Sequence, residues 1–457
     1  MAISDEDSTG TGTRPDTSLR RAVSGRMLLL FVIGDVLGAG IYTLVGEAAA
    51  EAGGALWIAL AVALGLALLT AASYVELVTR FPRAGGAAVF AHRAFRSEPV
   101  SFLVGFCGLA AGVTSVSALA IAFGGDYLSA LVDLPPVPVA LAFLVAIGLL
   151  NARGITESMR ANIVMTLVEA TGLVLVVVLG AVVVGRGDAD AARLGELPAG
   201  GTGGVALAVA AAAALAFYSF VGFETSANLA EETRDIRRSF PRALIGGLLV
   251  AGVLYILVGL VVTLTVPPDL LAGSSGPLLE VVRIADVGVP DWLFSLVALV
   301  AVTNTALLTG IFASRLAYGM ATDGLLPPVL GRVLPRRRTP WVAIVATLAV
   351  SMTLASTGSL EQLAETVVLL LLVTFASTNL AVIVLRGRPA EADAPDHVRV
   401  PLVLPVLGLL SCVGLATQQD AGVWLRAGLL LALGVALFAA TRLARGRGTR
   451  ADRSSRL

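Results

Sequence analysis

The sequence is poor in the residues from which enzymes and secreted domains usually build sites and cross-links. Its 457 residues include two cysteines and two histidines, and lysine is absent, so all 32 basic residues are arginine. Cys107 and Cys412 lie in long apolar segments, which argues against a disulfide framework. His92 and His397 lie in polar loops, where we expect them to face solvent. No metal-ligand spacing, phosphate loop or nucleophile–base pair appears, so we expect neither an enzyme nor a bound metal or cofactor.

Charge is also scarce, and apolar residues take its place. Only 14% of the residues are charged, 57% are hydrophobic and the mean hydropathy is +0.89, whereas a soluble domain has about 25% charged residues. Most apolar runs are about 18 to 25 residues long, enough to cross roughly 30 Å of hydrocarbon as helices. The sequence therefore predicts an all-α integral membrane protein with about twelve spans. The runs are 27–49, 55–79, 100–131, 137–152, 160–185, 204–228, 241–265, 290–321, 340–357, 363–385, 400–417 and 422–442.

Arginine is concentrated in every second loop and in the tail. The clusters fall at 80–96, 234–242, 332–338 and 442–456, and the loops between them hold mainly acids. By the positive-inside rule we expect both termini in the cytoplasm and the chain in the plasma (inner) membrane. The stretches 1–20 and 445–457 are polar and are predicted to be disordered cytoplasmic tails. No signal peptide precedes the first apolar run.

Glycine interrupts two of the apolar runs at matching places. The first interruption is Gly34-Asp35-Val36-Leu37-Gly38-Ala39-Gly40-Ile41, and the second is Tyr218-Ser219-Phe220-Val221-Gly222-Phe223-Glu224. Spans one to five and six to ten can be laid over each other, and each set opens with such an interruption. An unwound stretch at membrane depth survives only where it is buried or lines a cavity. Paired breaks of this kind indicate the substrate site of a transporter.

Four motifs carry a resemblance to a known family. Gly38-Ala39-Gly40-Ile41-Tyr42 resembles the first-span signature of the amino acid–polyamine–organocation superfamily, in particular its bacterial members that are similar to cationic amino acid transporters. The segments 217–242, 81–86 and 313–324 match the same family, so the resemblance covers most of 20–385. It implies a five-plus-five inverted repeat with discontinuous helices 1 and 6, and transport of amino acids or related amines. The transporter core is then 21–385, with repeats at about 27–185 and 204–385, followed by two extra helices in 386–444.

The two breaks predict how a zwitterion would bind. Where the first helix resumes after Gly38, amides without an intrahelical acceptor form a partly positive end suited to a carboxylate. Where the sixth helix stops near Tyr218, backbone carbonyls would face an α-ammonium group. The alternative is that Gly34 and Gly38 only let helices pack closely. The candidate substrate-binding residues at the breaks are Gly38, Ala39, Gly40, Ile41, Phe217, Tyr218, Phe220, Val221 and Gly222.

Further residues complete the predicted pocket. The resemblance places an aromatic lid at Tyr218 and lines the side-chain pocket with Val221, although a membrane tyrosine is also a common packing residue. Thr114 and Asn304 are candidates from the third and eighth spans, together with Ser117 and Thr303. Small polar residues also bond between helices without contacting a ligand. Nothing in these residues identifies the side chain of the substrate.

Three acids, Asp35, Glu169 and Glu224, lie inside predicted spans, where a charge costs roughly 3 kcal/mol or more. Glu224 aligns with a family glutamate linked to gating and proton response. Glu169 stands where many members carry a lysine that replaces a sodium ion and in some carries the coupled proton. At Asp35 the family usually has a small neutral residue. The chain therefore loses an ammonium and gains two carboxylates in helices that should pack together.

Two adjacent carboxylates in a low dielectric cannot both be charged without a cation. We therefore expect Asp35 and Glu169 to form a proton site or, second, to bind a cation such as sodium. The alternative is that both bond hydroxyls or an arginine and serve structure only. Proton-coupled amino acid transport by alternating access is the first prediction, ahead of exchange, uniport or transport of polyamines and ethanolamine-type amines. A non-transporting sensor is more distant. The expected partners are a small-molecule substrate and the lipid bilayer, and not nucleic acid.

Overall fold

The computed structural model describes residues 23–83, 85–153, 158–196, 204–271, 274–335, 337, 339–388 and 397–454. Within these ranges the regular secondary structure is helical, apart from one isolated bridge between Val23 and Thr233. Nine of the described helices are long and apolar enough to cross a membrane, and two apolar helices are shorter. The predicted all-α, multi-pass class is confirmed. The tail 1–20 lies outside the described residues.

Each predicted apolar run coincides with a helix or with a broken helix. The first run splits into α1 and α2, and the sixth into α9 and two 3-10 segments, η3 and η4. The bounds are α1 Gly25–Val36, α2 Gly40–Ala52, α3 Leu56–Arg80, α5 Glu98–Phe123, α7 Pro136–Arg153, α8 Ser158–Arg186, α9 Gly204–Ala216, η3 Phe217–Phe220, η4 Phe223–Leu229, α10 Ile236–Thr265, α13 Asp291–Thr322, α14 Trp341–Thr357, α15 Leu360–Arg386, α16 Val403–Ala416 and α17 Ala421–Ser454.

Two predicted boundaries are wrong. The third run was expected to continue to residue 131, but α5 ends at Phe123 because Gly124 and Gly125 follow it. The stretch 445–454 was expected to be a disordered tail, but α17 continues to Ser454. Its last turns are rich in arginine, which is a good helix former.

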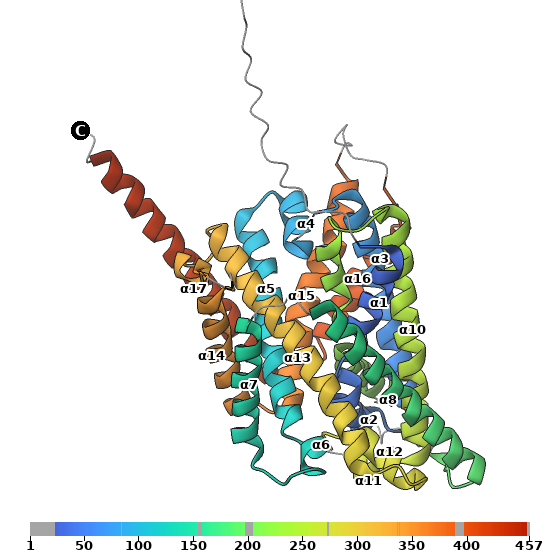
Figure 1. Ribbon diagram of the computed structural model, residues 1–457. Coiled ribbons are helices and arrows are strands. Elements are labelled where there is room, and N and C mark those ends of the chain that lie inside the picture. The colour runs from blue at the N-terminus through green and yellow to red at the C-terminus, as the bar shows by residue number, and fades with distance from the viewer. Residues whose placement is uncertain are drawn as a thin grey trace, which may run out of the picture.

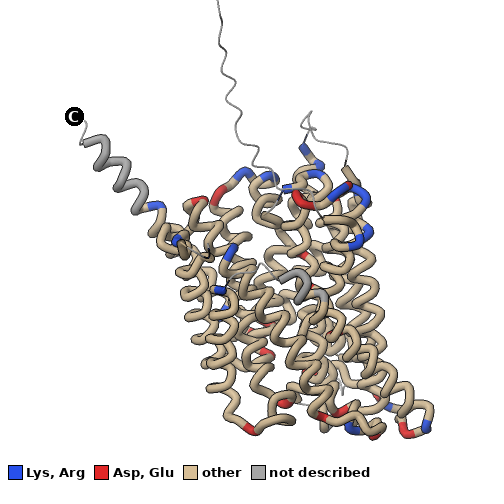
Figure 2. Tube along the Cα trace, viewed as in Figure 1, with Lys and Arg blue, Asp and Glu red and all other residues tan. Residues whose placement is uncertain are grey.

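Short connecting elements divide the molecule into two faces (Figure 1). One face carries α4 (Gly86–Phe95), and we call it the α4 face; α1 begins here and α17 ends here. The opposite face, the α6 face, carries α6 (Asp126–Ser129), α11 (Pro268–Leu271) and α12 (Pro277–Ala285). Arginines gather along the α4 face, as predicted from the loops, whereas acids prevail on the α6 face (Figure 2). The connections also include η1 Gly53–Ala55, η2 Ala191–Gly195 and η5 Pro328–Gly331.

Helix packing in the first five spans repeats in the next five. Helix α1 packs on α10 as α9 packs on α3, and α5 packs on α15 as α13 packs on α8. In the first pair, α1 and α10 are spans one and seven, and their counterparts five spans away are α9 (span six) and α3 (span two). In the second pair, α5 and α15 are spans three and ten, and their counterparts are α13 (span eight) and α8 (span five). Five is an odd number, so the second set crosses in the opposite direction, as an inverted repeat requires. Helices α16 and α17 pack outside this arrangement, on α3, α5 and α15.

A buried ion pair joins the repeat to α16 at the α4 face. Glu76 of α3 is 1% exposed, and its Oε1 accepts a hydrogen bond from Arg386 Nε at 2.8 Å. Glu76 Oε2 also pairs with Arg386 and accepts from the amide of Val400 at 3.0 Å. Thr79 Oγ1 accepts from the amide of Val398 at 3.2 Å. The segment before α16 is therefore fastened to the end of α3.

We expect Glu76→Gln to lower the free energy of unfolding by about 3 kcal/mol, because it leaves the Arg386 guanidinium without its counter-charge. Unfolding of the purified chain in detergent measures this loss. The control is Glu98→Gln, which breaks the ion pair between Glu98 and Arg442. The side chains of these two residues are 50% and 46% exposed, respectively. That change should cost less than about 1 kcal/mol. Equal losses of unfolding free energy in the two variants would show that the buried pair stabilises the chain no more than the exposed pair does.

Candidate functional site

The first span breaks between Val36 and Gly40. The amides of Leu37 and Gly38 donate to the carbonyls of Ile33 and Val36, both at 2.7 Å, and then the chain leaves the helix. The carbonyl of Val36 also accepts from Tyr255 Oη at 2.5 Å. Because α2 starts afresh at Gly40, the amides of its first turn have no acceptor within the helix. The predicted break and its helix N-terminus are therefore present.

One of the predicted free amides already has a partner. The amide of Ala39 donates to Thr305 Oγ1 of α13 at 3.1 Å, and Thr305 in turn donates to the carbonyl of Ala301 at 3.0 Å. Ala39 has no cap from its own side chain. Thr305 therefore caps α2 from another helix, and from Thr43 onward the helix supplies its own acceptors, beginning with the carbonyl of Ala39.

The sixth span changes from α-helix to 3-10 turns after Ala216. Val221 is extended, with its amide donating to the carbonyl of Tyr218 at 3.1 Å. Gly222 has φ +125°, a conformation that favours glycine. A Cβ at Gly222 would lie 2.6 Å from the carbonyl oxygen of Asp35. Glycine at this position therefore lets the two broken spans touch.

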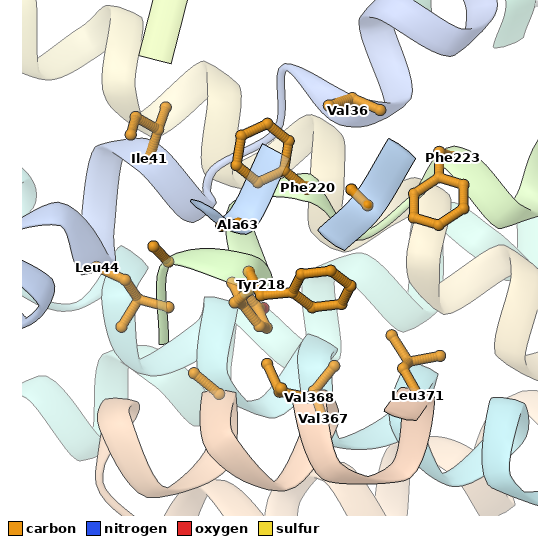
Figure 3. Close-up of a cluster of buried hydrophobic side chains, with 14 of the residues drawn as sticks. Val36, Ile41, Leu44, Ala63, Tyr218, Phe220, Phe223, Val367, Val368 and Leu371 are labelled. Carbon is orange, nitrogen blue, oxygen red and sulfur yellow. The ribbon is translucent and has the colours of Figure 1, made fainter. Parts of the chain in front are cut away.

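The two breaks face each other and are buried. A Cβ built on Gly40 would lie 2.8 Å from Ser219 Cα and 3.1 Å from Tyr218 Cδ1. Tyr218 is 6% exposed, and its Oη lies 2.9 Å from Ser115 Oγ of α5. In the view of Figure 3, Tyr218 lies between Phe220 and the side chains of Val367 and Val368 from α15. The break residues Ile41, Phe217 and Phe220 are also buried.

The remaining predicted pocket residues divide into two groups. Asn304 contacts the acid site described below. Thr114 Oγ1 donates to the carbonyl of Ala110 at 2.8 Å, and Ser117 and Thr303 make the same bond within their own helices. These intrahelical bonds satisfy the hydroxyls without a ligand.

Sequence reasoning missed Thr305 and Ser115, which contact the two breaks. Each is the immediate neighbour of a predicted residue, Asn304 or Thr114. The signal that could have found them is the rotational phase of α13 and α5, because one residue turns a helix by about 100°.

Glu169 carries an unsatisfied buried oxygen. The residue is 0% exposed, and its Oε1 accepts from Asn304 Nδ2 at 3.0 Å. Asn304 Nδ2 also donates to Asn162 Oδ1 at 3.1 Å. Glu169 Oε2 has no hydrogen-bond partner, and neither does Thr166 Oγ1, one turn earlier on α8. A buried polar atom without a partner marks a place for a proton, a cation or water.

Two of the three predicted acids lie on the broken spans, Asp35 on α1 and Glu224 on η4, whereas Glu169 lies on α8. Asp35 is close enough to Glu169 and to Glu224 for electrostatic interaction with both. Asp35 Oδ2 accepts from Thr225 Oγ1, and Glu224 Oε2 accepts from the amide of Gly222 at 2.9 Å. Among the described residues, no arginine pairs with any of the three. A purely structural role, in which each acid is bonded by a hydroxyl or an arginine, therefore fits Asp35, which accepts from a hydroxyl. It does not fit Glu169, whose Oε2 has no hydrogen-bond partner.

Within the described ranges, no group of three or more histidine, cysteine or acidic side chains is placed to hold a metal ion.

At the α4 face the start of the first span is joined to the end of the sixth by backbone hydrogen bonds. The amide of Val23 donates to the carbonyl of Glu232 at 2.9 Å, and the amide of Arg234 donates to the carbonyl of Val23 at 2.9 Å. This backbone bridge joins the start of α1 to the segment after η4. Helix α1 also packs on α8 and α10. The start of α1 is therefore fixed at the α4 face to the segment that follows the second break.

Comparison with known proteins gives a consistent result. A family model described as amino acid permease matches residues 25–425. The chain is 30% identical to the branched-chain amino acid permease BcaP of Bacillus subtilis, over 92% of this chain and 94% of that protein. It is 31% identical to cationic amino acid transporter 4 of mouse (84% and 63% covered) and 28% identical to the methylthioribose transporter of Bacillus subtilis (92% and 93%).

Proposed function

This chain belongs to the amino acid permease family, and from that premise we propose that it moves an amino acid across the plasma membrane by alternating access, coupled to protons. The observation that carries the proposal is the facing pair of broken helices. The amide end of α2 suits a carboxylate, and the 3-10 turns at Tyr218 offer backbone carbonyls beside it. Burial of both breaks gives a site at the centre of the helix bundle.

Proton coupling rests on Glu169 and Asp35. A carboxylate oxygen that is buried without a partner carries a large cost when charged, and a bound proton removes that cost. Asp35 at interacting distance raises the cost further. Glu169 contacts Asn304, and the next residue, Thr305, caps α2. Binding of a proton to Glu169 is thereby linked, through Asn304 and Thr305, to the helix end that would hold the substrate carboxylate. Sodium at the same place is the second choice.

Orientation follows from the arginine distribution. We propose that the α4 face, which is rich in arginine, lies in the cytoplasm together with both termini; the arginines of this face support the proposal through the positive-inside rule. The α6 face is then outside the cell. The lipid bilayer surrounds α7, α14 and α17, whose outer faces bear exposed apolar side chains such as Leu149, Val345 and Leu425.

A carrier of amines without a carboxylate is the second candidate. The three acids Asp35, Glu169 and Glu224 would attract and bind a cationic amine. The methylthioribose transporter among the relatives indicates that similar chains carry solutes other than amino acids. Competition between an amine and an amino acid for uptake separates the two cases.

The test is uptake by proteoliposomes under an inward proton gradient, an inward sodium gradient or neither. The panel contains branched-chain and cationic amino acids, ethanolamine and a polyamine. We expect a proton gradient to drive accumulation of an amino acid above its external concentration. Flux only against internal substrate would replace symport by exchange, and downhill flux alone would indicate a uniporter. Saturable binding without flux of any compound would contradict transport and favour a sensor.

A further inference from the structure

The short helix α6 fastens the end of α5 to two other parts of the α6 face. Gly124 and Gly125 separate it from α5 and turn the chain across the end of the span. In Figure 1 it lies beside α2, α11 and α12. The predicted site does not include α6. Its hydrogen bonds to residues 274–276 and to α2 come from two consecutive residues, Asp126 and Tyr127.

Asp126 holds the connection between α11 and α12. Its Oδ2 accepts from Ser274 Oγ at 3.0 Å, from the amide of Ser275 at 2.8 Å and from the amide of Gly276 at 3.2 Å. In return, the amide of Asp126 donates to Ser275 Oγ at 2.8 Å. Hydrogen bonds to a carboxylate are stronger than those between neutral groups.

Tyr127 holds α2. Its side chain is 0% exposed, and its Oη donates to the carbonyl of Tyr42 at 2.7 Å. Tyr42 lies two residues after Gly40, in the first turn of α2. The bond from Tyr127 therefore reaches the helix end that the proposed function assigns to the substrate carboxylate.

A single movement would break both fastenings. Helices α11 and α12 both pack against α2, so the three form one layer over the α6 face. Both Asp126 and Tyr127 bond to this layer from α6. If the layer moves away from α6, the bonds to the 274–276 segment and to Tyr42 are lost together.

We propose that Asp126 and Tyr127 form a latch that closes the α6 face and positions the amide end of α2. The role of the latch in transport rests on the proposed function, but its existence can be tested without transport. The expected consequence of releasing it is a larger population in which the α2 layer has moved away from α6.

The experiment measures that movement by pulsed electron paramagnetic resonance on the full chain in lipid nanodiscs. Spin labels are placed at Asp133→Cys and Val287→Cys, on exposed positions beyond α6 and beyond α12. Cys107 and Cys412 are 0% and 3% exposed and should not react. We expect Tyr127→Phe, which loses one hydrogen bond, to raise the ratio of long to short distances about tenfold. Asp126→Ala loses three bonds to its carboxylate and should raise the ratio at least as much.

Matched variants distinguish release of the latch from a general loss of folded protein. Asp126→Asn keeps one acceptor oxygen and should restore part of the short-distance population, whereas Asp188→Ala, at an exposed acid on the same face, should change nothing. In uptake, a released latch should lower KM for external substrate and slow turnover, whereas loss of folded protein would lower only the maximal rate. Unchanged distances in Asp126→Ala and Tyr127→Phe would overturn the latch. Changed distances in a chain that transports nothing would retain the latch and reject the proposed function.

Discussion

Uptake should fall about 10- to 100-fold when Gly40 is replaced by alanine. The new Cβ would lie 2.8 Å from Ser219 Cα, a backbone atom that cannot swing aside. Overpacking of this kind costs about 1–3 kcal/mol, and each 1.4 kcal/mol corresponds to about a factor of ten in a binding constant. The two breaks must then separate, and the added methyl group covers the amide end of α2. Initial rates of uptake in proteoliposomes measure the loss.

The control for this change is Gly65→Ala in α3. A Cβ at Gly65 would meet no atom within 4 Å, and alanine is the better helix former. This variant should fold and transport like the parent chain. If Gly40→Ala transported equally well at the same protein level, the broken helices would not form the binding site.

Gradient-driven accumulation should be abolished when Glu169 is replaced by glutamine. The amide keeps the size of the side chain and can still accept from Asn304, but it can neither take up nor release a proton. A carrier with this change should still exchange labelled for unlabelled substrate, because exchange needs no net proton movement. The measurement compares accumulation under a proton gradient with counterflow in the same vesicles.

Two further variants sharpen this result. Asp35→Asn removes the second carboxylate and should weaken coupling. Glu280→Gln changes a partly buried acid of α12 that pairs with Arg283 at 2.6 Å, away from the breaks, and should have no effect on coupling. Accumulation by Glu169→Gln at the level of the parent chain would reject Glu169 as the coupling residue. Loss of both accumulation and counterflow would mean that Glu169 is required for the site itself.

The spans and the breaks could be predicted because their causes are local. Long apolar runs form helices in lipid, and glycines such as Gly38, Gly40 and Gly222 mark where the helix stops. The end of α5 was missed because Gly124 and Gly125 lie inside an otherwise apolar run. Only the structure reveals that these glycines turn the chain into α6.

The partners of the breaks could not be predicted because they depend on how distant helices are rotated. Thr305 is 266 residues away from Ala39, and Ser115 is 103 residues away from Tyr218. The sequence indicated the correct spans, α13 and α5, and included Asn304. It could not decide which face of each helix meets the break, since α5 is buried on most sides and shows no polar stripe.

The bridge at Val23 has a consequence for how such a chain can evolve. Both of its hydrogen bonds join backbone groups, those of Val23 with Glu232 and Arg234. A substitution that changes only a side chain at these positions leaves both hydrogen-bonding groups of the bridge in place. Proline, which has no amide hydrogen, is the substitution that would cut it. The bridge therefore depends on peptide groups and on the path of the backbone, and the identity of the side chains does not supply its hydrogen bonds.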